Sequence, residues 1–481
     1  MVQMMADNRQ ADVIVIGAGA TGLMAAISAA DEGANVLHFE KTSKVGGTFW
    51  IAGGTSTGAA TKMQFEAGIF EDSPAVFYSD CMKELRARQV CESENLMFFC
   101  QNSGYAIDWL DSLGAYQGKE RSPQLPIYGE PWIYPRSYFS TTKKYLNIIR
   151  SEHQKRIDRG DIMLKLNTEV ADLVNEGRRV VEVKVGEKHY RAGAVILTTG
   201  GYSGNIELMI KHKFPQAKKV LSAGLPDATG DGLKWCQHLD AKLVNMDQQQ
   251  LPYFGQIEDA DNPGQAITHL DVNKYPGAIW VDNNGQRVTR EDAGAYISST
   301  RIALIKAPDM MLSVIIDDKI KRENDSILVK WYGGAEPRSW KWFEEKANEG
   351  IIIKKAETIE GLGRLLEINP KNFTDTVTKY NGYVAAGKDT DFGREELVYK
   401  IENPPFYGAR SVPVQLTSSG GPATNIEMQV LDSSNKIIPG LYAAGEITAY
   451  RAIGTGGLNI GCLVYGRQAG KMAARDVFRL R

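Results

Sequence analysis

The sequence predicts an α/β protein with two domains, one of which is built on a parallel sheet. Two observations predict this class: the length of 481 residues, and a glycine-rich turn that joins a buried strand to a helix near the N-terminus. A chain of this length exceeds what one compact core usually holds, so two domains are expected. The strand–turn–helix order is typical of a parallel sheet with crossover helices.

The first element is a short apolar, β-branched strand at Asp12–Ile16, followed by Gly17-Ala18-Gly19-Ala20-Thr21-Gly22. A helix is expected over Leu23–Asp31, and a second strand over Asn35–Phe39 that ends at Glu40. In a dinucleotide-binding turn the first glycine permits the bend, the second admits the pyrophosphate, and the third lets helix and strand pack closely. The free N–H groups at the helix start favour phosphate, so the segment predicts a Rossmann-like nucleotide site.

The residues after this motif favour a flavin over a nicotinamide cofactor. Glu40 stands where an acidic residue bonds ribose hydroxyls, which argues against a 2′-phosphate and hence against NADP. Gly46-Gly47 and Gly53-Gly54 follow within Lys41–Gly54, and such glycines let the backbone lie against a large planar ligand. No second glycine fingerprint is present, so a separate nicotinamide domain is not expected.

Bulk properties exclude several classes of function. Hydrophobic residues make up 43% and charged residues 24%, and the net charge is −2. Without a long run of Lys or Arg, nucleic acid is not an expected partner. The five cysteines are scattered, without CxxC spacing, which predicts free thiols in a reducing compartment, and no metal site. Val13–Ala30 is uncharged but interrupted by glycines, so we expect a strand, a turn and a helix, no membrane span, and a cytoplasmic location.

Further motifs resemble one flavoprotein family. They are Ala194–Gly201 (AVILTTGG), Thr229–Gly232 (TGDG), Ile279–Glu291 (IWVDNNGQRVTRE), Ile438–Glu446 (IPGLYAAGE) and Gly456–Gly461 (GGLNIG). Together they are similar to the soluble fumarate reductases, succinate dehydrogenase flavoprotein subunits and 3-ketosteroid dehydrogenases. The resemblance covers nearly the whole chain, and the IPGLYAAGE segment is its most specific match.

The resemblance implies a Rossmann-like FAD-binding domain with an inserted α+β capping domain. Residues 1–245 and 418–481 would form the FAD domain, and residues 246–417 the cap that holds the substrate. FAD would be bound non-covalently, because no histidine suited to a covalent link is recognisable near Lys44–Gly54. The expected FAD-binding residues are Gly17, Gly19, Ala20, Thr21, Gly22, Glu40, Lys41, Gly46, Gly47, Thr48, Ala52, Gly53, Gly54, Val170, Thr199, Gly200, Gly201, Asp231, Gly445, Glu446, Gly457, Leu458, Asn459 and Ile460.

The chain departs from the family at the substrate. The dicarboxylate reductases hold fumarate with two histidines and two arginines, and the matching positions here are Leu251, Ala295, Thr417 and about Gly454. Arg290 and Arg451 are the nearby cations. A hydrogen bond to a charged group contributes about 1.5–3 kcal/mol, so losing several would weaken the binding of a small dicarboxylate greatly.

Aromatic and hydroxylated residues stand near those positions instead. The 3-ketosteroid branch, which uses tyrosines as acid and base and apolar walls around the ring system, is the closest in kind. We expect Tyr296, Tyr253, Glu291, Arg290 and Ser418 as catalytic residues. In the family, the glutamate that matches Glu291 lies beside the substrate in a proton path. A surface ion pair between Arg290 and Glu291 is equally consistent with the sequence. The aromatic, proline-containing stretch 104–139 is a candidate wall of a pocket.

The expected reaction is hydride transfer between FAD and an activated C=C of an apolar enone such as a 3-ketosteroid, in either direction. Electrons would then pass to or from an external donor or acceptor, because the sequence has no haem or iron–sulfur motif. Three alternatives remain open. They are a reductase of aryl acrylates or other unsaturated acids using Arg290 or Arg451, a nicotinamide-dependent dehydrogenase, and a non-catalytic electron-transfer flavoprotein.

Overall fold

The computed structural model describes residues 10–87, 94–125, 132–247, 253–255, 257–258, 266–270, 276–292, 298–324, 329–330, 340–418, 420–449 and 457–480. The chain divides into two compact units. Unit 1 comprises residues 1–202, 227–248 and 417–481, and unit 2 comprises residues 203–226 and 249–416. The sequence-based division placed residues 203–226 with the FAD domain, and the structure assigns them to unit 2 instead.

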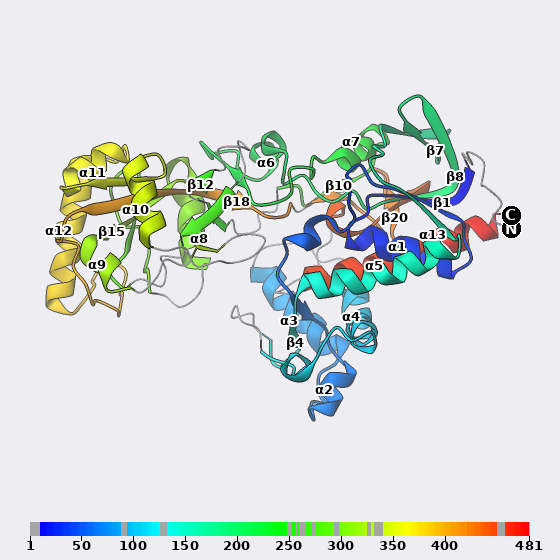
Figure 1. Ribbon diagram of the computed structural model, residues 1–481, viewed down its shortest axis with the longest axis horizontal. Coiled ribbons are helices and arrows are strands. Elements are labelled where there is room, and N and C mark those ends of the chain that lie inside the picture. The colour runs from blue at the N-terminus through cyan, green and yellow to red at the C-terminus, as the bar shows by residue number, and fades with distance from the viewer. Residues whose placement is uncertain are drawn as a thin grey trace. The chain divides into compact units, whose positions relative to one another are not determined.

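Unit 1 is built on an eight-stranded sheet within the described residues (Figure 1). Its strands are β1 (Gln10–Ile16), β2 (Val36–Phe39), β5 (Ile162–Lys165), β6 (Asp172–Glu176), β7 (Arg179–Val185), β8 (Lys188–Leu197), β20 (Gln429–Leu431) and β21 (Ile437–Ala443). The order β21-β8-β1-β2-β5 is parallel throughout, and β20, β7 and β6 add antiparallel pairs. The C-terminal strand thus completes the sheet that the N-terminal strand begins, as the pairing of Leu441 with Val195 shows.

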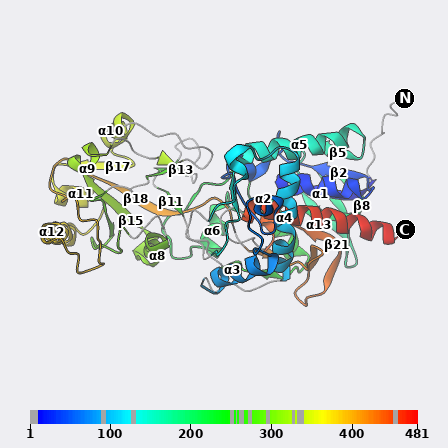
Figure 2. The same ribbon diagram turned by 90° about the horizontal axis from the view of Figure 1, so that it is seen from below.

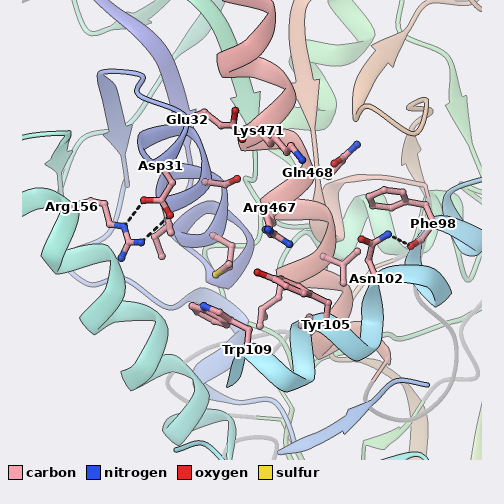
Figure 3. Close-up of a pocket in the computed structure, with 16 residues that line it drawn as sticks. Asp31, Glu32, Phe98, Asn102, Tyr105, Trp109, Arg156, Arg467, Gln468 and Lys471 are labelled. Carbon is pink, nitrogen blue, oxygen red and sulfur yellow. Dashed lines mark hydrogen bonds and ion pairs between the residues drawn. The ribbon is translucent and has the colours of Figure 1, made fainter. Parts of the chain in front are cut away.

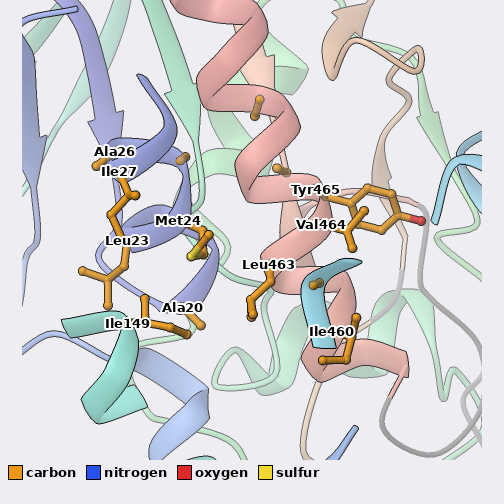
Figure 4. Close-up of a cluster of buried hydrophobic side chains, with 14 of the residues drawn as sticks. Ala20, Leu23, Met24, Ala26, Ile27, Ile149, Ile460, Leu463, Val464 and Tyr465 are labelled. Carbon is orange, nitrogen blue, oxygen red and sulfur yellow. The ribbon is translucent and has the colours of Figure 1, made fainter. Parts of the chain in front are cut away.

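Helices α1 (Ala20–Asp31), α5 (Thr142–Asp158) and α13 (Gly457–Arg479) lie side by side in unit 1 (Figure 2). A Cβ on Gly466 would lie 2.4 Å from the Thr21 carbonyl oxygen, and one on Gly470 would lie 2.1 Å from that of Ala25. These two glycines, four positions apart, therefore let α13 approach the backbone of α1. Apolar side chains between the helices form the core shown in Figure 4, including Leu23, Met24 and Leu463.

The remaining elements of unit 1 surround this core. They are β3 (Thr55–Thr57), α2 (Lys62–Glu66), α3 (Pro74–Ala87), α4 (Glu94–Ser112), β4 (Ser137–Phe139), α7 (Asp231–His238), β10 (Leu243–Val244) and β19 (Gly421–Pro422). Arg136 is fully buried, bonds Asp72 and Asp80, and lies over the Phe77 ring. Because both acids are buried as well, these ion pairs are protected from water.

Unit 2 has a mostly antiparallel sheet and a cover of helices. Its main strands are β9 (Leu221–Ser222), β11 (Tyr253–Gly255), β14 (Ile279–Asp282), β15 (Leu312–Asp317), β17 (Ile353–Ala356) and β18 (Phe406–Gln415). A smaller sheet joins β12 (Ile257–Glu258), β13 (Ala266–Leu270) and β16 (Val329–Lys330). Its helices are α6 (Ile206–His212), α8 (Ser298–Lys306), α9 (Asp318–Arg322), α10 (Trp340–Glu349), α11 (Ile359–Leu365) and α12 (Pro370–Ala386).

The helices of the described ranges include none that is long and apolar enough to cross a membrane. In the same part of the chain, no group of three or more His, Cys, Asp or Glu side chains is arranged to hold a metal ion. Cys81, Cys100 and Cys236 are buried, and burial raises the pKa of Cys236 to about 12.

Candidate cofactor-binding site

The glycine turn expected from the sequence lies between β1 and α1. Gly17 has a φ of +98°, and a Cβ there would lie 2.5 Å from the Thr198 carbonyl oxygen. A Cβ on Gly22 would lie 1.8 Å from the Gly17 carbonyl oxygen, whereas nothing lies within 4 Å of the Cβ position of Gly19. Two glycines are therefore required by packing, and the third leaves room for a ligand next to the backbone.

Helix α1 begins earlier than the sequence predicted. It starts at Ala20 with Gly19 as its N-cap, instead of at Leu23, and the N–H of Leu23 donates to the Gly19 carbonyl. The N–H groups of Ala20, Thr21 and Gly22 belong to the first turn, where no carbonyl four residues earlier is part of the helix. Ala20, Thr21 and Gly22, which were all predicted to bind FAD, thus lie at the N-terminal end of α1, the end that attracts phosphate.

Glu40, at the end of β2, is held against this turn. Its Oε2 accepts the N–H of Ala18 at 2.7 Å, and its Oε1 accepts the N–H of Thr42 at 2.8 Å. A carboxylate has lone pairs for further hydrogen bonds, so these contacts orient Glu40 and leave it able to accept from a hydroxyl. The expected bond to the ribose stays a prediction.

The paired glycines after Glu40 pack on the same turn. Gly46 has a φ of +127° and its N–H donates to the Ala18 carbonyl at 2.8 Å. A Cβ on Gly47 would lie 3.2 Å from the Cα of Gly19. Thr48 belongs to the short helix Gly47–Trp50 that follows.

The second pair, Gly53 and Gly54, is held by side chains distant in sequence. Asn459 on α13 donates to the carbonyls of Gly53 and Thr55 at 2.6 and 2.7 Å. Tyr145 on α5 donates to the Gly54 carbonyl at 3.0 Å. The backbone of this loop is therefore fixed by α5 and α13, and Asn459 positions the loop rather than standing free.

Three later motifs converge on the same region. A Cβ on Gly232 would lie 2.4 Å from Thr199 Oγ1, and one on Gly445 would lie 2.5 Å from Thr21 Oγ1. A Cβ on Gly201 would lie 2.5 Å from Glu446 Oε1. Segments that are more than two hundred residues apart in the sequence thus meet beside the first turn of α1.

Lys41 and Asp231, both predicted to contact FAD, bond each other. Lys41 Nζ lies 2.8 Å from Asp231 Oδ2 and 3.0 Å from Thr229 Oγ1. Partial burial raises the pKa of Asp231, but the hydrogen bond and charge of Lys41 outweigh it, so the pKa is lowered overall. Asp231 also begins α7, after Gly230 with a φ of +81°.

The remaining predicted FAD-binding residues have different surroundings. Thr142 Oγ1 donates to the Ala52 carbonyl at 2.8 Å. Val170 lies in the core cluster beside the sheet, and Ile460 is fully buried in the helix core. Gly457 and Leu458 open the described part of α13, and Gly200 has a φ of +72° in the turn after β8.

The surroundings of the turn fit an FAD molecule. The Cβ side of Gly19 is open, and the first turn of α1 presents N–H groups there. Thr199 Oγ1 is buried and has no hydrogen-bond partner within the described residues. A buried hydroxyl without a partner is costly, and a cofactor with polar atoms in this place would satisfy it.

The residues predicted to be catalytic are only partly described. Tyr296 and Arg451 lie outside the described residues, and only the backbone of Tyr253, in β11, is described. Ser418 is buried, and its Oγ accepts the N–H of Tyr202 at 2.8 Å while its own N–H donates to Glu446 Oε1 at 2.8 Å. Its hydroxyl thus helps hold the turn that follows β8.

The suggested Arg290–Glu291 pair is wrong. Glu291 is buried in unit 2, where its carboxylate bonds Arg287 at 2.6 and 2.9 Å and lies 3.3 Å from Arg394. Arg290 bonds Asp292 at 2.8 Å and also pairs with a further carboxylate. The sequence suggested the wrong partner because adjacent residues here point to different neighbours.

The aromatic stretch 104–139 divides between a core and a pocket. Tyr116 and Tyr138 are buried, and burial raises the pKa of both. Tyr105 and Trp109 line a pocket of about 220 Å³, with Arg467 over the Tyr105 ring at 4.2 Å (Figure 3). This pocket contains none of the residues predicted for catalysis or for FAD.

Taken together, the parallel sheet, the glycine turn and the convergent motifs define an FAD-dependent oxidoreductase. The FAD-binding domain family matches residues 12–462 of the chain. The chain belongs to this family, and within it to the fumarate reductase family, whose members act on carbon–carbon double bonds.

The chain is 30% identical over 475 residues to a probable fumarate reductase of Shewanella frigidimarina, covering 96% of this chain and 74% of the relative. It resembles the open conformation of a flavocytochrome c3 fumarate reductase with a TM-score of 0.72 and 27% identity, over 98% of this chain and 79% of that one. A 3-ketosteroid Δ1-dehydrogenase from Sterolibacterium denitrificans shares the fold with a TM-score of 0.74, at 19% identity over 97% of this chain and 100% of that one.

Proposed function

We propose that the protein transfers hydride between FAD and the C=C of an apolar enone, such as a 3-ketosteroid. The observation that carries this proposal is that Arg290 already forms ion pairs within the protein. Its guanidinium bonds Asp292 and lies 3.1 Å from Glu395, so its charge is already balanced by two carboxylates. A cation with two acidic partners is a poor receptor for a substrate carboxylate, which supports a neutral substrate.

Bound FAD supplies hydride exchange at N5 with the β-carbon of the conjugated double bond. The chain then has to supply a proton at the neighbouring carbon, and Tyr296 and Tyr253 are our candidates for that step. A tyrosine with an ordinary pKa of about 10 is protonated at neutral pH and acts more readily as an acid than as a base. This favours reduction of the substrate over its dehydrogenation.

Negative charge that develops on the substrate carbonyl needs fixed donors. We assign this role to the backbone N–H groups of Gly457 and Leu458, at the start of the described part of α13. Ser418 is a weaker candidate, because its hydroxyl already bonds the backbone of Tyr202 and approaches Glu446.

A reductase of unsaturated carboxylic acids is the second candidate. It is favoured by the 30% identity of the chain to a probable fumarate reductase. In that case Arg451 is the cation that would hold the substrate carboxylate, since Arg290 is engaged elsewhere.

The test is an anaerobic titration of the photoreduced protein. A 3-keto-4-ene steroid, a hydroxycinnamate and fumarate are added in separate cuvettes, and flavin reoxidation is followed by absorbance. Reoxidation by the steroid alone supports the enone proposal, and Tyr296→Phe and Tyr253→Phe should then slow it. Reoxidation by either acid, abolished by Arg451→Gln, supports the second candidate. Reoxidation by none of the three, but by an artificial electron acceptor, would indicate an electron-transfer flavoprotein.

A further inference from the structure

Two buried histidines lie behind the glycine turn. His38 on β2 is fully buried, and His153 on α5 is 3% exposed. His38 Nε2 lies 3.0 Å from the Gly17 carbonyl oxygen, and His38 Nδ1 lies 3.1 Å from His153 Nε2. The two rings meet edge to face, with centroids 5.2 Å apart.

The contacts require one arrangement of hydrogens. A carbonyl oxygen accepts only, so His38 Nε2 must carry the hydrogen that points to Gly17. A neutral imidazole has one N–H, which leaves His38 Nδ1 as the acceptor of the His153 Nε2–H. His153 on α5 therefore donates to His38 on β2, and His38 donates to the Gly17 carbonyl in the turn. The hydrogen bond from His153 supports the His38 tautomer that donates to Gly17, although His153 does not touch the turn itself.

The peptide unit between Gly17 and Ala18 is held at both ends. Its carbonyl accepts from His38 and from Thr198 Oγ1, at 3.0 and 2.8 Å, and its N–H donates to Glu40 Oε2 at 2.7 Å. This peptide immediately precedes Gly19, next to which a pyrophosphate would lie. Rotation of the peptide would move the first N–H groups of α1.

We propose that His38 and His153 are positioning residues for FAD, which fix the Gly17–Ala18 peptide and thereby the phosphate-binding start of α1. Neither residue belongs to the nucleotide motif, and each acts through the backbone rather than by touching the cofactor. The proposal rests on FAD as the cofactor and not on the identity of the substrate.

Burial keeps the two histidines neutral. Burial lowers the pKa of His38 to about 4, against the smaller raising effects of the Gly17 bond and of Glu40. Burial also lowers the pKa of His153 to about 3, and His38 and Arg156 lower it further. Protonation would turn His38 Nδ1 into a donor facing another donor and break the relay, so acid should weaken FAD binding through this pair.

The experiment measures FAD affinity of the apo-protein by quenching of flavin fluorescence. Loss of one neutral hydrogen bond corresponds to a factor of about two to ten in affinity, so His38→Leu and His153→Leu should each raise the Kd for FAD by up to about tenfold. His38→Gln keeps a donor for Gly17 and should stay within about threefold of wild type. His189→Leu is the matched control, because His189 is an exposed histidine that pairs with Glu182.

The melting temperature of each apo-protein is measured alongside, to separate positioning from packing. A lower melting temperature with an unchanged Kd in His38→Leu and His153→Leu would show a purely structural pair and overturn the proposal. If His38→Leu does not fold, His153→Leu and His38→Gln decide. A wild-type Kd in His153→Leu refutes the relay. The Kd of wild type should rise as the pH falls through about 4, where His38 of the folded protein becomes protonated, and an equal rise in His38→Gln would also refute the relay.

Discussion

Glu291 provides the sharpest test of whether the buried network of unit 2 is structural. Its side chain is 4% exposed, and those of Arg287, Arg394 and Asp389 are 3%, 2% and 0% exposed. The four groups carry two positive and two negative charges. Glu291→Gln removes one negative charge and leaves an unbalanced cation away from water. Breaking a buried pair in this way costs about 3–5 kcal/mol.

For a unit of this size, a loss of about 3 kcal/mol lowers the melting temperature by roughly 6–12 °C. The assay is differential scanning calorimetry of the holo-protein, with flavin reoxidation measured on the same preparation. Glu291→Gln combined with Arg394→Met restores the charge balance, so the double variant should melt higher than the sum of the single losses predicts. If Glu291→Gln melts like wild type but loses turnover, Glu291 acts on a proton at the substrate and the structural reasoning is refuted.

Three further predictions concern unit 1. Gly22→Ala would place a Cβ 1.8 Å from a backbone carbonyl, so the purified variant should lose its yellow colour on gel filtration; retained FAD would contradict the packing argument. Asp231→Asn weakens the 2.8 Å contact with Lys41 and should raise the Kd for FAD several-fold. Calorimetric titration measures this Kd, and Lys234→Gln is the control for a change of charge alone. His38 has a pKa lowered from 6.5 to about 4, so the unfolded state binds more protons between these values, and stability falls as the pH falls through this window. We expect the apo-protein to lose about 3 kcal/mol between pH 7 and pH 4, with a smaller loss in His38→Gln; parallel urea curves for the two proteins would contradict this.

Local features of the sequence predicted the glycine turn and its flanking strands correctly. Gly17 and Gly22 are required because a side chain at either position would collide with backbone atoms only a few residues or one strand away. The strands over Asp12–Ile16 and Asn35–Phe39 were also predicted to within two residues, because apolar, β-branched runs indicate a buried parallel strand. The start of α1 was misplaced, since Thr21 and Gly22 in its first turn have low helix propensity.

Contacts between residues distant in the sequence could not be predicted from such local patterns. Glu291 bonds Arg287 and Arg394 rather than its neighbour Arg290, because the direction of each side chain follows from the fold of unit 2. The assignment of residues 203–226 to unit 2 depends on β9, which pairs with β18 almost two hundred residues later. Neither the ion pairs of Glu291 nor the pairing of β9 with β18 leaves a pattern in the local sequence.

The sequence by itself determined the family, the FAD cofactor and the positions of the glycines, because each of these depends on the spacing of a few neighbouring residues. Only the tertiary structure brought His153 on α5 against His38, 115 positions earlier, and placed both behind the nucleotide turn. The physical reason is that a hydrogen-bond relay between buried side chains needs helix packing to set its distances. Helix packing depends on the whole core rather than on any one segment.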